Sequence, residues 1–196
     1  MNAVIIYKHI NLDELNIEKI LYRYVPFNTN NKYLHQISII LLMYLLNKYN
    51  KDYTDILKTY HYSKDNIPIA NINFSNSYCD DYIVVGISDN NIGVDIEKNN
   101  NYEIDILHSN EENFDTTCIF TLKESLGKYL RVGLNYNYKN IDLSSRTFPF
   151  YRYGCYFDSI KFDNYVLSTC SNFNKMDFIN IDDEELNKFI NSILTK

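Results

Sequence analysis

Two apolar segments near the middle of the chain are separated by a short polar turn. The segments are Tyr82 to Ser88 and Ile92 to Glu97, and Asp89-Asn90-Asn91 lies between them. This pattern predicts two strands that pair as a β-hairpin. Successive side chains alternate faces along a strand, so Asp95 and Glu97 are expected on one face and their apolar neighbours on the other. Two carboxylates on one face of a strand end can form part of a metal site.

A helix is expected from about Asp115 to Leu130, where apolar residues recur at helical spacing. Asp115, Thr116 or Thr117 can cap its start, and Gly133 can follow its end. Its expected buried stripe is Cys118, Ile119, Leu122, Leu126, Tyr129 and Leu130, and its expected opposite side is Phe120, Thr121, Glu124, Lys128 and Arg131. Other helices are expected at Lys32 to Lys48, at Asp52 to Tyr60, near Ile104 to His108, and after a cap at Asp182-Asp183. Further strands are expected at Ala70 to Phe74, Tyr151 to Phe162 and Tyr165 to Ser171.

Composition and cysteine spacing indicate a globular protein of the cytoplasm. The chain has 196 residues with 45% hydrophobic and 22% charged content, enough for one domain or two small halves. The cysteines at positions 79, 118, 155 and 170 show no CxxC spacing, and the N-terminus shows no signal peptide, so we expect free thiols. The longest apolar run, Ile37 to Leu46, is about half the roughly 20 residues of a membrane span, and we expect it in a core helix.

Charge is divided unequally along the chain. Residues 1–64 hold eight Lys or Arg and five Asp or Glu, whereas residues 65–196 hold eleven and twenty. An acidic chain of this kind is a poor nucleic-acid binder, yet its basic first part could hold a small phosphorylated ligand. Unequal solvated surfaces are the alternative explanation.

Glu124 and Lys128 are four residues apart on the helix expected at Asp115 to Leu130. By itself such a pair is most often a surface ion pair. The order of motifs favours another interpretation, because a strand with Asp95-x-Glu97 precedes a helix with Lys123-Glu124-x-x-x-Lys128.

This order resembles the paired signature of the 4′-phosphopantetheinyl transferases. Gly93-Val94-Asp95-Ile96-Glu97 is similar to that family's G-[IV]-D-x-E strand, and Phe120 to Lys128 (FTLKESLGK) is similar to its [FW]-[ST]-x-K-E-[SA]-x-x-K helix. Weaker similarities to the surfactin-synthetase-activating type are Ile67-Pro68, Asn73 to Ser77, and Tyr165 to Cys170.

The resemblance implies an α+β fold of two similar halves, residues 1–88 and 89–196, related by a pseudo-twofold axis with coenzyme A in the cleft between them. It implies transfer of the phosphopantetheine arm of coenzyme A to a serine of an apo acyl or peptidyl carrier protein, with Mg²⁺ or Mn²⁺ as cofactor and adenosine 3′,5′-bisphosphate as the second product. The implied metal ligands are Asp95, Glu97 and Glu124, and Lys128 would contact the pyrophosphate. Glu112 is the expected general base, with Glu111 one residue away as the alternative.

The same resemblance assigns coenzyme A contacts to Ser75, Asn76 and Lys64, with a simple surface lysine as the alternative at position 64. Two positions depart from the pattern. Asn76 stands where members of this type usually have His, and Gln36 stands near the position of an Arg, so two cationic phosphate contacts are missing. These departures keep a second hypothesis open: a carrier-protein or nucleotide-binding homologue without turnover.

The residue types suit this chemistry on their own. Mg²⁺ prefers oxygen ligands, which carboxylates supply. His9, His35, His61 and His108 lack the spacing of zinc ligands. In this scheme the serine nucleophile belongs to the carrier protein. We therefore expect a cytoplasmic monomer that binds coenzyme A and a carrier protein, and neither nucleic acid nor a membrane.

Overall fold

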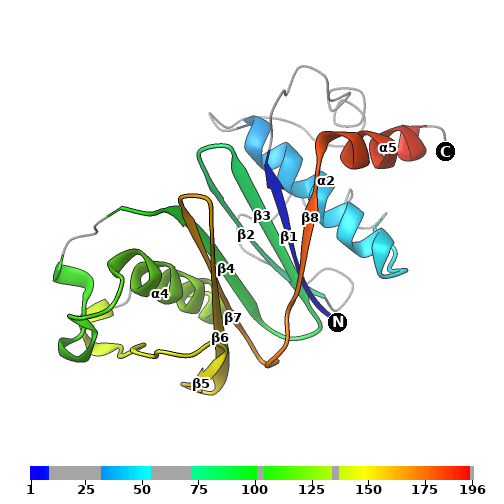
Figure 1. The fold of residues 1–196 in the computed structure, drawn as a ribbon. Helices are drawn as coiled ribbons and strands as arrows, with labels where there is room; N and C mark the ends of the chain where they lie inside the picture. Colours follow the sequence, from blue (N-terminus) through cyan, green and yellow to red (C-terminus); the bar gives the residue numbers. More distant parts are fainter. Residues whose placement is uncertain (9–31, 54–71, 101–103, 134–136, 195–196) are drawn as a thin grey trace.

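The computed structural model describes residues 1–8, 32–53, 72–100, 104–133 and 137–194. Within these residues the chain is a mixed α+β protein with two four-stranded sheets and three α-helices. The sheets pack face to face, and helices cover the outer face of each one (Figure 1). The expected α+β class is confirmed, while the pseudo-twofold relation and the ligand cleft stay predictions.

The first sheet brings the two ends of the described chain together. Its strand order is β2 (Asn73–Cys79), β3 (Tyr82–Ser88), β1 (Asn2–Lys8) and β8 (Asp177–Ile181). β1 is antiparallel to β3 and parallel to β8. The helices α2 (Lys32–Lys48) and α5 (Asp183–Leu194) share an apolar core with this sheet that includes Ile5 and Leu186. The last strand and helix therefore pack with the first part of the chain, although the boundary expected at residue 88 placed them in the second half; that boundary stays a prediction.

The second sheet is antiparallel throughout. Its strand order is β4 (Ile92–Lys98), β7 (Tyr165–Ser171), β6 (Cys155–Phe162) and β5 (Phe150–Arg152). Helix α4 (Thr116–Leu130) packs on its outer face. The helix begins after Asp115, whose carboxylate accepts a hydrogen bond from the backbone N–H of Cys118 at 3.0 Å. It ends at Arg131, which adopts the left-handed conformation at φ 59°.

A third apolar core lies between the two sheets. It contains Val94 and Ile96 of β4 together with residues of β1 and β3. The sheets approach closely at Gly86 of β3, where an added Cβ would lie 2.7 Å from Cγ1 of Val94. Because side chains alternate along β4, Asp95 and Glu97 face the opposite way, toward α4.

The prediction that β3 and β4 pair as a β-hairpin is wrong. The two strands follow each other closely in the chain, but β3 pairs with β1 and β2, whereas β4 pairs with β7. All residues of β3 are buried, which suits a central strand with neighbours on both sides. The turn between β3 and β4 therefore carries the chain from one sheet to the other.

Other expectations are corrected in part. The single strand expected at Tyr151 to Phe162 is the hairpin β5–β6, because Tyr153 and Gly154 have φ of 52° and 80° and turn the chain. A strand was expected at Ala70 to Phe74, but the strand in this region is β2, Asn73–Cys79. Strands β1 and β8 were not expected. The bounds of α2, β3 and β7 are as predicted, and Asp182 caps α5 by accepting a hydrogen bond from the N–H of Glu185. Most of the helix expected at Asp52 to Tyr60 lies outside the described residues.

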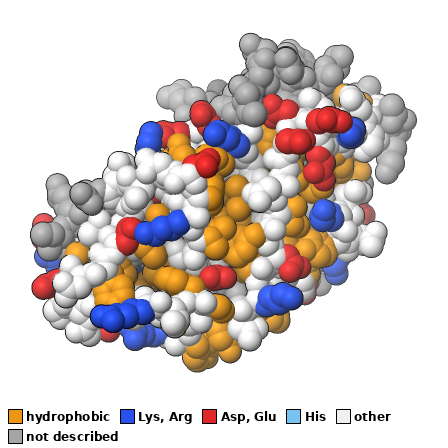
Figure 2. All heavy atoms as spheres, in the orientation of Figure 1, with side chains coloured by type: hydrophobic (Ala, Val, Ile, Leu, Met, Phe, Trp, Pro, Cys, Tyr) orange, Lys and Arg blue, Asp and Glu red, His pale blue; other side chains and the backbone are white. Residues whose placement is uncertain are grey.

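Charged side chains of both signs are interspersed on the face drawn in Figure 2, with hydrophobic side chains gathered across the middle of the view. In the described part of the chain, no helix combines the length and the apolar character needed to span a membrane.

Candidate functional site at the junction of the two sheets

The edge strands β2 and β4 meet through their side chains, although they belong to different sheets. The contacts are Val94 N–H donating to Ser75 Oγ at 3.1 Å, Ser77 Oγ donating to Asp95 Oδ1 at 2.9 Å, and Lys98 N–H donating to Cys79 Sγ at 3.3 Å. These contacts advance in the same direction along both strands. The edges therefore run side by side and parallel, and short polar side chains of β2 satisfy groups of β4.

Gly93 allows α4 to rest directly on β4. A Cβ at this position would lie 1.9 Å from the carbonyl oxygen of Ser125 and 2.6 Å from the backbone nitrogen of Tyr129. Only a residue without a side chain permits this approach. The contact brings Glu124 and Lys128, one helical turn apart, to the strand that carries Asp95.

Lys128 joins the two sheet edges. Its ammonium donates to Oδ1 of Asp95 at 2.8 Å, to the carbonyl oxygen of Val94 at 3.0 Å and to the carbonyl oxygen of Asn76 at 3.3 Å. An ammonium has three N–H donors, so all of them are used. Among the ion pairs of the described residues, the partner of Lys128 is Asp95 and not Glu124. The simple surface ion pair of Glu124 and Lys128 is therefore absent.

Asp95 has one oxygen without a partner. Its side chain is 5% exposed, and Oδ1 accepts from both Lys128 and Ser77. Oδ2 is buried and has no hydrogen-bond partner within the described structure. Burying an acceptor in this way is unfavourable and calls for an explanation. A ligand that supplies a positive charge or a donor to Oδ2 would remove the penalty.

Glu124 is half-buried beside Asp95 and Lys128. Burial raises the pKa of its carboxyl, the hydrogen bond from the Tyr138 hydroxyl opposes that rise, and the charge of Asp95 adds to it. The pKa of Tyr138 is itself raised, by burial first and then by Glu124. The site therefore concentrates negative charge in a poorly solvated place, as cation-binding sites do.

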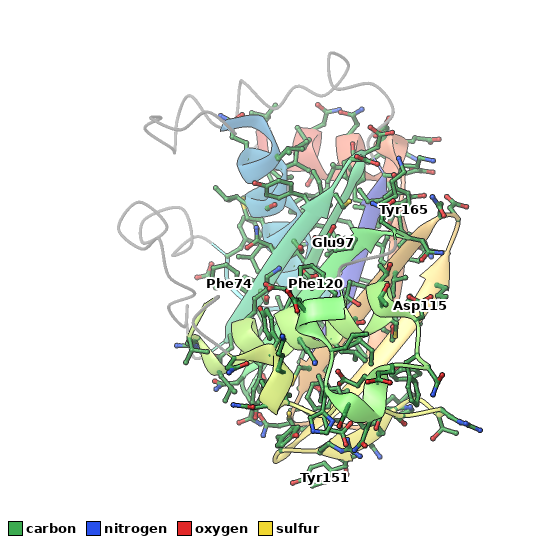
Figure 3. All side chains as sticks on the ribbon, turned by 90° about the vertical axis from the view of Figure 1, so that its left-hand side faces the viewer. Phe74, Glu97, Asp115, Phe120, Tyr151 and Tyr165 are labelled. Carbon is green, nitrogen blue, oxygen red and sulfur yellow. The ribbon has the colours of Figure 1, made fainter. Side chains whose placement is uncertain are left out.

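Glu97 lies one strand repeat beyond Asp95 and is half-buried (Figure 3). Its Oε2 is 3.8 Å from the thiol of Cys79, which donates toward it. The carboxylates at 95, 97 and 124 are ligands of the type that Mg²⁺ prefers, and Oδ2 of Asp95 is free to bind. However, no three carboxylate, histidine or cysteine side chains of the described chain are gathered closely enough to form a ready metal-binding group.

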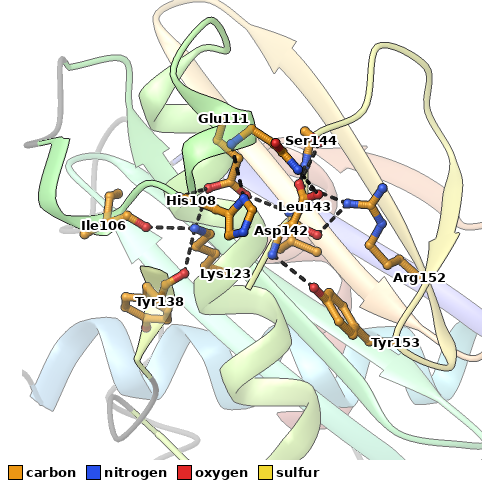
Figure 4. Close-up of polar contacts among 11 residues, drawn as sticks. Ile106, His108, Glu111, Lys123, Tyr138, Asp142, Leu143, Ser144, Arg152 and Tyr153 are labelled. Carbon is orange, nitrogen blue, oxygen red and sulfur yellow. Dashed lines mark hydrogen bonds and ion pairs between the residues drawn. The ribbon is translucent and has the colours of Figure 1, made fainter. Parts of the chain in front are cut away.

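The two candidate bases have different environments. Glu111 is fully buried in a polar cluster, where one oxygen accepts from Lys123 Nζ at 2.5 Å and from His108 N–H at 2.8 Å (Figure 4). Its other oxygen accepts from the N–H of Leu143 at 2.6 Å. Glu112 is exposed and is the accessible carboxylate of the pair. Glu111 is thus occupied by structural contacts, which leaves Glu112 as the accessible candidate.

The expected coenzyme A contacts are placed unevenly. Ser75 is fully buried, with its hydroxyl accepting from β4, so it offers no exposed surface. Asn76 is half-buried, and its carbonyl oxygen accepts from Lys128. Gln36 is buried in α2, and Lys64 lies outside the described residues.

Three participants, Ser77, Lys123 and Tyr138, were given no role from the sequence. Ser77 and Tyr138 contact Asp95 and Glu124 from segments that only the tertiary fold brings near, so no local signal marks them. Lys123 did have a signal. It lies on the same side of α4 as Ile119 and Leu126, where a charged residue indicates a buried partner. On the same helix, Leu130 is exposed and Thr121 buried, opposite to the expectation.

Comparison with known proteins adds no identification: no protein-family model matches the sequence, and no curated protein matches it at a significant level.

Proposed function

We propose that the protein is a Mg²⁺-dependent 4′-phosphopantetheinyl transferase that modifies a serine of an apo acyl or peptidyl carrier protein. The observation that carries the proposal is the unpartnered, buried Oδ2 of Asp95 at a place where Gly93 brings α4 onto β4. Strand, helix and glycine of the motif thus meet at one polar site, as the resemblance requires. The two-half arrangement with coenzyme A bound between the halves is part of the same proposal.

The residues have distinct parts in this proposal. Asp95, Glu97 and Glu124 would hold the Mg²⁺, which when bound neutralises charge on the pyrophosphate. Lys128 can reach a phosphate oxygen only by exchanging one of its carbonyl acceptors for it, because its three donors are already used. Glu112, exposed to solvent, would accept the proton of the carrier serine.

A second candidate is a homologue that binds a nucleotide or a carrier protein without turnover. The observation in its favour is that all three N–H donors of Lys128 bind acceptors within the protein, so Lys128 has a structural role in holding the two sheet edges together. The fully buried Ser75 and Gln36 in the place of an arginine also favour it.

The test is the intact mass of purified apo carrier domains after incubation with the protein, coenzyme A and Mg²⁺. We expect a mass gain of one phosphopantetheine on serine, lost when EDTA is added. Asp95→Asn and Glu124→Gln should each lower kcat by about 10²-fold or more, the scale of removing one electrostatic stabiliser. Asp105→Asn is the matched control, because this carboxylate is 83% exposed and pairs with Lys139.

The outcomes separate the two candidates. Binding of coenzyme A by calorimetry with no mass gain on any carrier of a broad panel would favour the homologue without turnover. Transfer that is indifferent to EDTA would contradict the metal assignment alone.

A further inference from the structure

Lys123 is a fully buried cation at the centre of a polar cluster (Figure 4). Its ammonium donates to Oε2 of Glu111 at 2.5 Å, to the carbonyl oxygen of Ile106 at 2.7 Å and to the carbonyl oxygen of Tyr138 at 2.9 Å. These acceptors belong to the short helices η3 (Ile104–Ile106), η4 (Ser109–Glu111) and η5 (Tyr138–Asn140). One side chain of α4 therefore fixes three separate segments that have little regular structure of their own.

Tyr138 is attached to α4 at both of its ends. Its backbone carbonyl accepts from Lys123, and its phenol donates to Oε1 of Glu124, the next residue of the helix. The ammonium of the buried ion pair thus contacts the backbone of the tyrosine, and the tyrosine hydroxyl contacts the carboxylate of Glu124. Lys128, the neighbour one turn along, does not compete for this carboxylate, because its donors are used by Asp95, Val94 and Asn76.

The hydrogen bond uses only one oxygen of Glu124. Within the described residues Oε2 has no hydrogen-bond partner, and the carboxylate lies near enough to Asp95 for their charges to interact. A carboxylate held through one oxygen, with the other oxygen unengaged beside a second carboxylate, is a pre-oriented cation ligand. Residues that orient ligands in this way commonly change metal affinity by about 10- to 100-fold when they are removed.

We propose that Tyr138 is a positioning residue that holds Glu124 for binding a divalent cation, and that the buried Lys123–Glu111 pair sets its place. This inference rests on the proposed function, since it concerns the cation of that site. It adds to the site a residue outside the strand and helix motifs.

Tyr138→Phe tests the inference because it removes the hydroxyl and keeps the backbone carbonyl that binds Lys123. The probe is Mn²⁺ alone, titrated into the full chain without coenzyme A and followed by the paramagnetic resonance of the free ion. We expect about 10-fold weaker binding for Tyr138→Phe, with a thermal unfolding midpoint close to that of the unsubstituted chain. A merely structural role would change the midpoint and leave the affinity of the folded protein unchanged.

Two further variants make the outcome specific. Tyr151→Phe is the matched control, since Tyr151 is 62% exposed, and its affinity should be unchanged. Glu124→Gln should weaken binding at least as much as Tyr138→Phe. If Glu124→Gln weakens binding and Tyr138→Phe does not, the positioning role is overturned while the proposed cation site stands. Two results would also contradict the metal part of the proposed function. One is that the unsubstituted protein binds no Mn²⁺, and the other is that Glu124→Gln binds Mn²⁺ with the same affinity as the unsubstituted protein.

Discussion

Lys128 is a residue whose contacts are nearly all internal. Its ammonium joins a buried carboxylate to carbonyl oxygens from two sheets, and its side chain is 27% exposed while that of Asp95 is 5% exposed. Neither charge is well solvated, so each depends on the other for compensation. Removing one member of such a pair is far more costly than removing an exposed ion pair.

Lys128→Met is expected to lower the free energy of unfolding by about 3 kcal/mol, the lower end of the range for breaking a buried pair, because Lys128 keeps some exposure. Asp95 would be left buried without its cation. Lys139→Met is the control, because its ion pair with Asp105 is solvated and should change stability by about 0.5 kcal/mol or less. Urea unfolding followed by far-UV circular dichroism measures both, since the chain has no Trp to report by fluorescence. If Lys128→Met and Lys139→Met lowered the free energy of unfolding by the same small amount, the fold would not depend on the internal contacts of Lys128, and its ammonium would be free to bind a ligand.

Asp142 gives a prediction about pH. Burial acts to raise the pKa of its carboxyl, but hydrogen bonds from Ser144 and Asn110 and the charge of Arg152 outweigh it and hold the pKa below its ordinary value of 3.8. A carboxyl with a lowered pKa stabilises the fold above the ordinary value, and this contribution is lost as the pH falls below it. Asp142→Asn should therefore destabilise the protein by about 1–2 kcal/mol at pH 7, with a difference that closes in acid.

Asp158→Asn is the control with the opposite sign. Burial raises the pKa of Asp158, with the hydrogen bond from the N–H of Ser159 opposing. Its ionisation therefore costs stability as the pH rises above 3.8, so this variant should gain relative to the unsubstituted protein over that range. Unfolding by urea at several pH values gives both curves, and parallel curves for the two variants would contradict the assignment.

At the scale of single residues, the sequence predicted the positions of those site residues that belong to local motifs. Asp95, Glu97, Glu124 and Lys128 lie on the elements where periodicity placed them, because a strand and a helix set the face of each residue. The partners of these residues could not be predicted. Ser77 and Tyr138 reach the site through sheet edges and loops whose positions depend on the whole fold.

At the scale of elements, the packing of α4 on β4 depends on Gly93. Gly93→Ala is expected to destabilise the protein by about 3 kcal/mol, the upper part of the range for overpacking, because the added methyl meets backbone atoms that cannot rotate away. Gly86→Ala is the matched control, since its methyl meets the ends of the Val94 and Ile92 side chains at 2.7 and 2.8 Å, which can shift. Thermal unfolding of the two variants is the measurement, and an equal or smaller loss for Gly93→Ala would contradict this view of the contact.

The predictions of elements succeeded where one segment carries its own signal. Helices α2 and α4 and strands β3 and β7 have clear periodicity or apolar runs with polar ends, and their bounds are close to those expected. The hairpin of β3 and β4 failed because pairing is not a local property. A short turn permits pairing, but both edges of β3 pair with other strands, β1 and β2, so β4 pairs with β7 instead.

At the scale of the whole molecule, the first sheet is closed by a strand from far along the chain. β1 has β3 on one side and β8 on the other, and the register places Ile5 opposite Ile179. The second sheet, in contrast, is built from residues between 92 and 171. The two sheets therefore differ in how much of the chain each one needs.

Removal of residues 177–194 should affect the sheets unequally. β1 would lose its parallel neighbour and the cover of α5, which buries Leu186 and Ile190, so its amides should exchange rapidly with solvent. The amides of β4 and β7 should keep more of their protection, because all their partners remain. Hydrogen exchange read by mass spectrometry distinguishes the two sheets, and equal loss of protection in both would mean that they fold only as one unit.

The pairing of β8 with β1 also has a consequence for translation. A ribosome that adds about 5–20 residues per second synthesises all strands of the second sheet, the last of which ends at Ser171, before it makes residues 177–181, which the first sheet still lacks. β1 is synthesised before the other described strands, so the interval before β8 can pair with it is long. A pause in translation just before the codon for Asp177 would prolong the exposure of the β1 edge that β8 covers to other nascent chains and to chaperones.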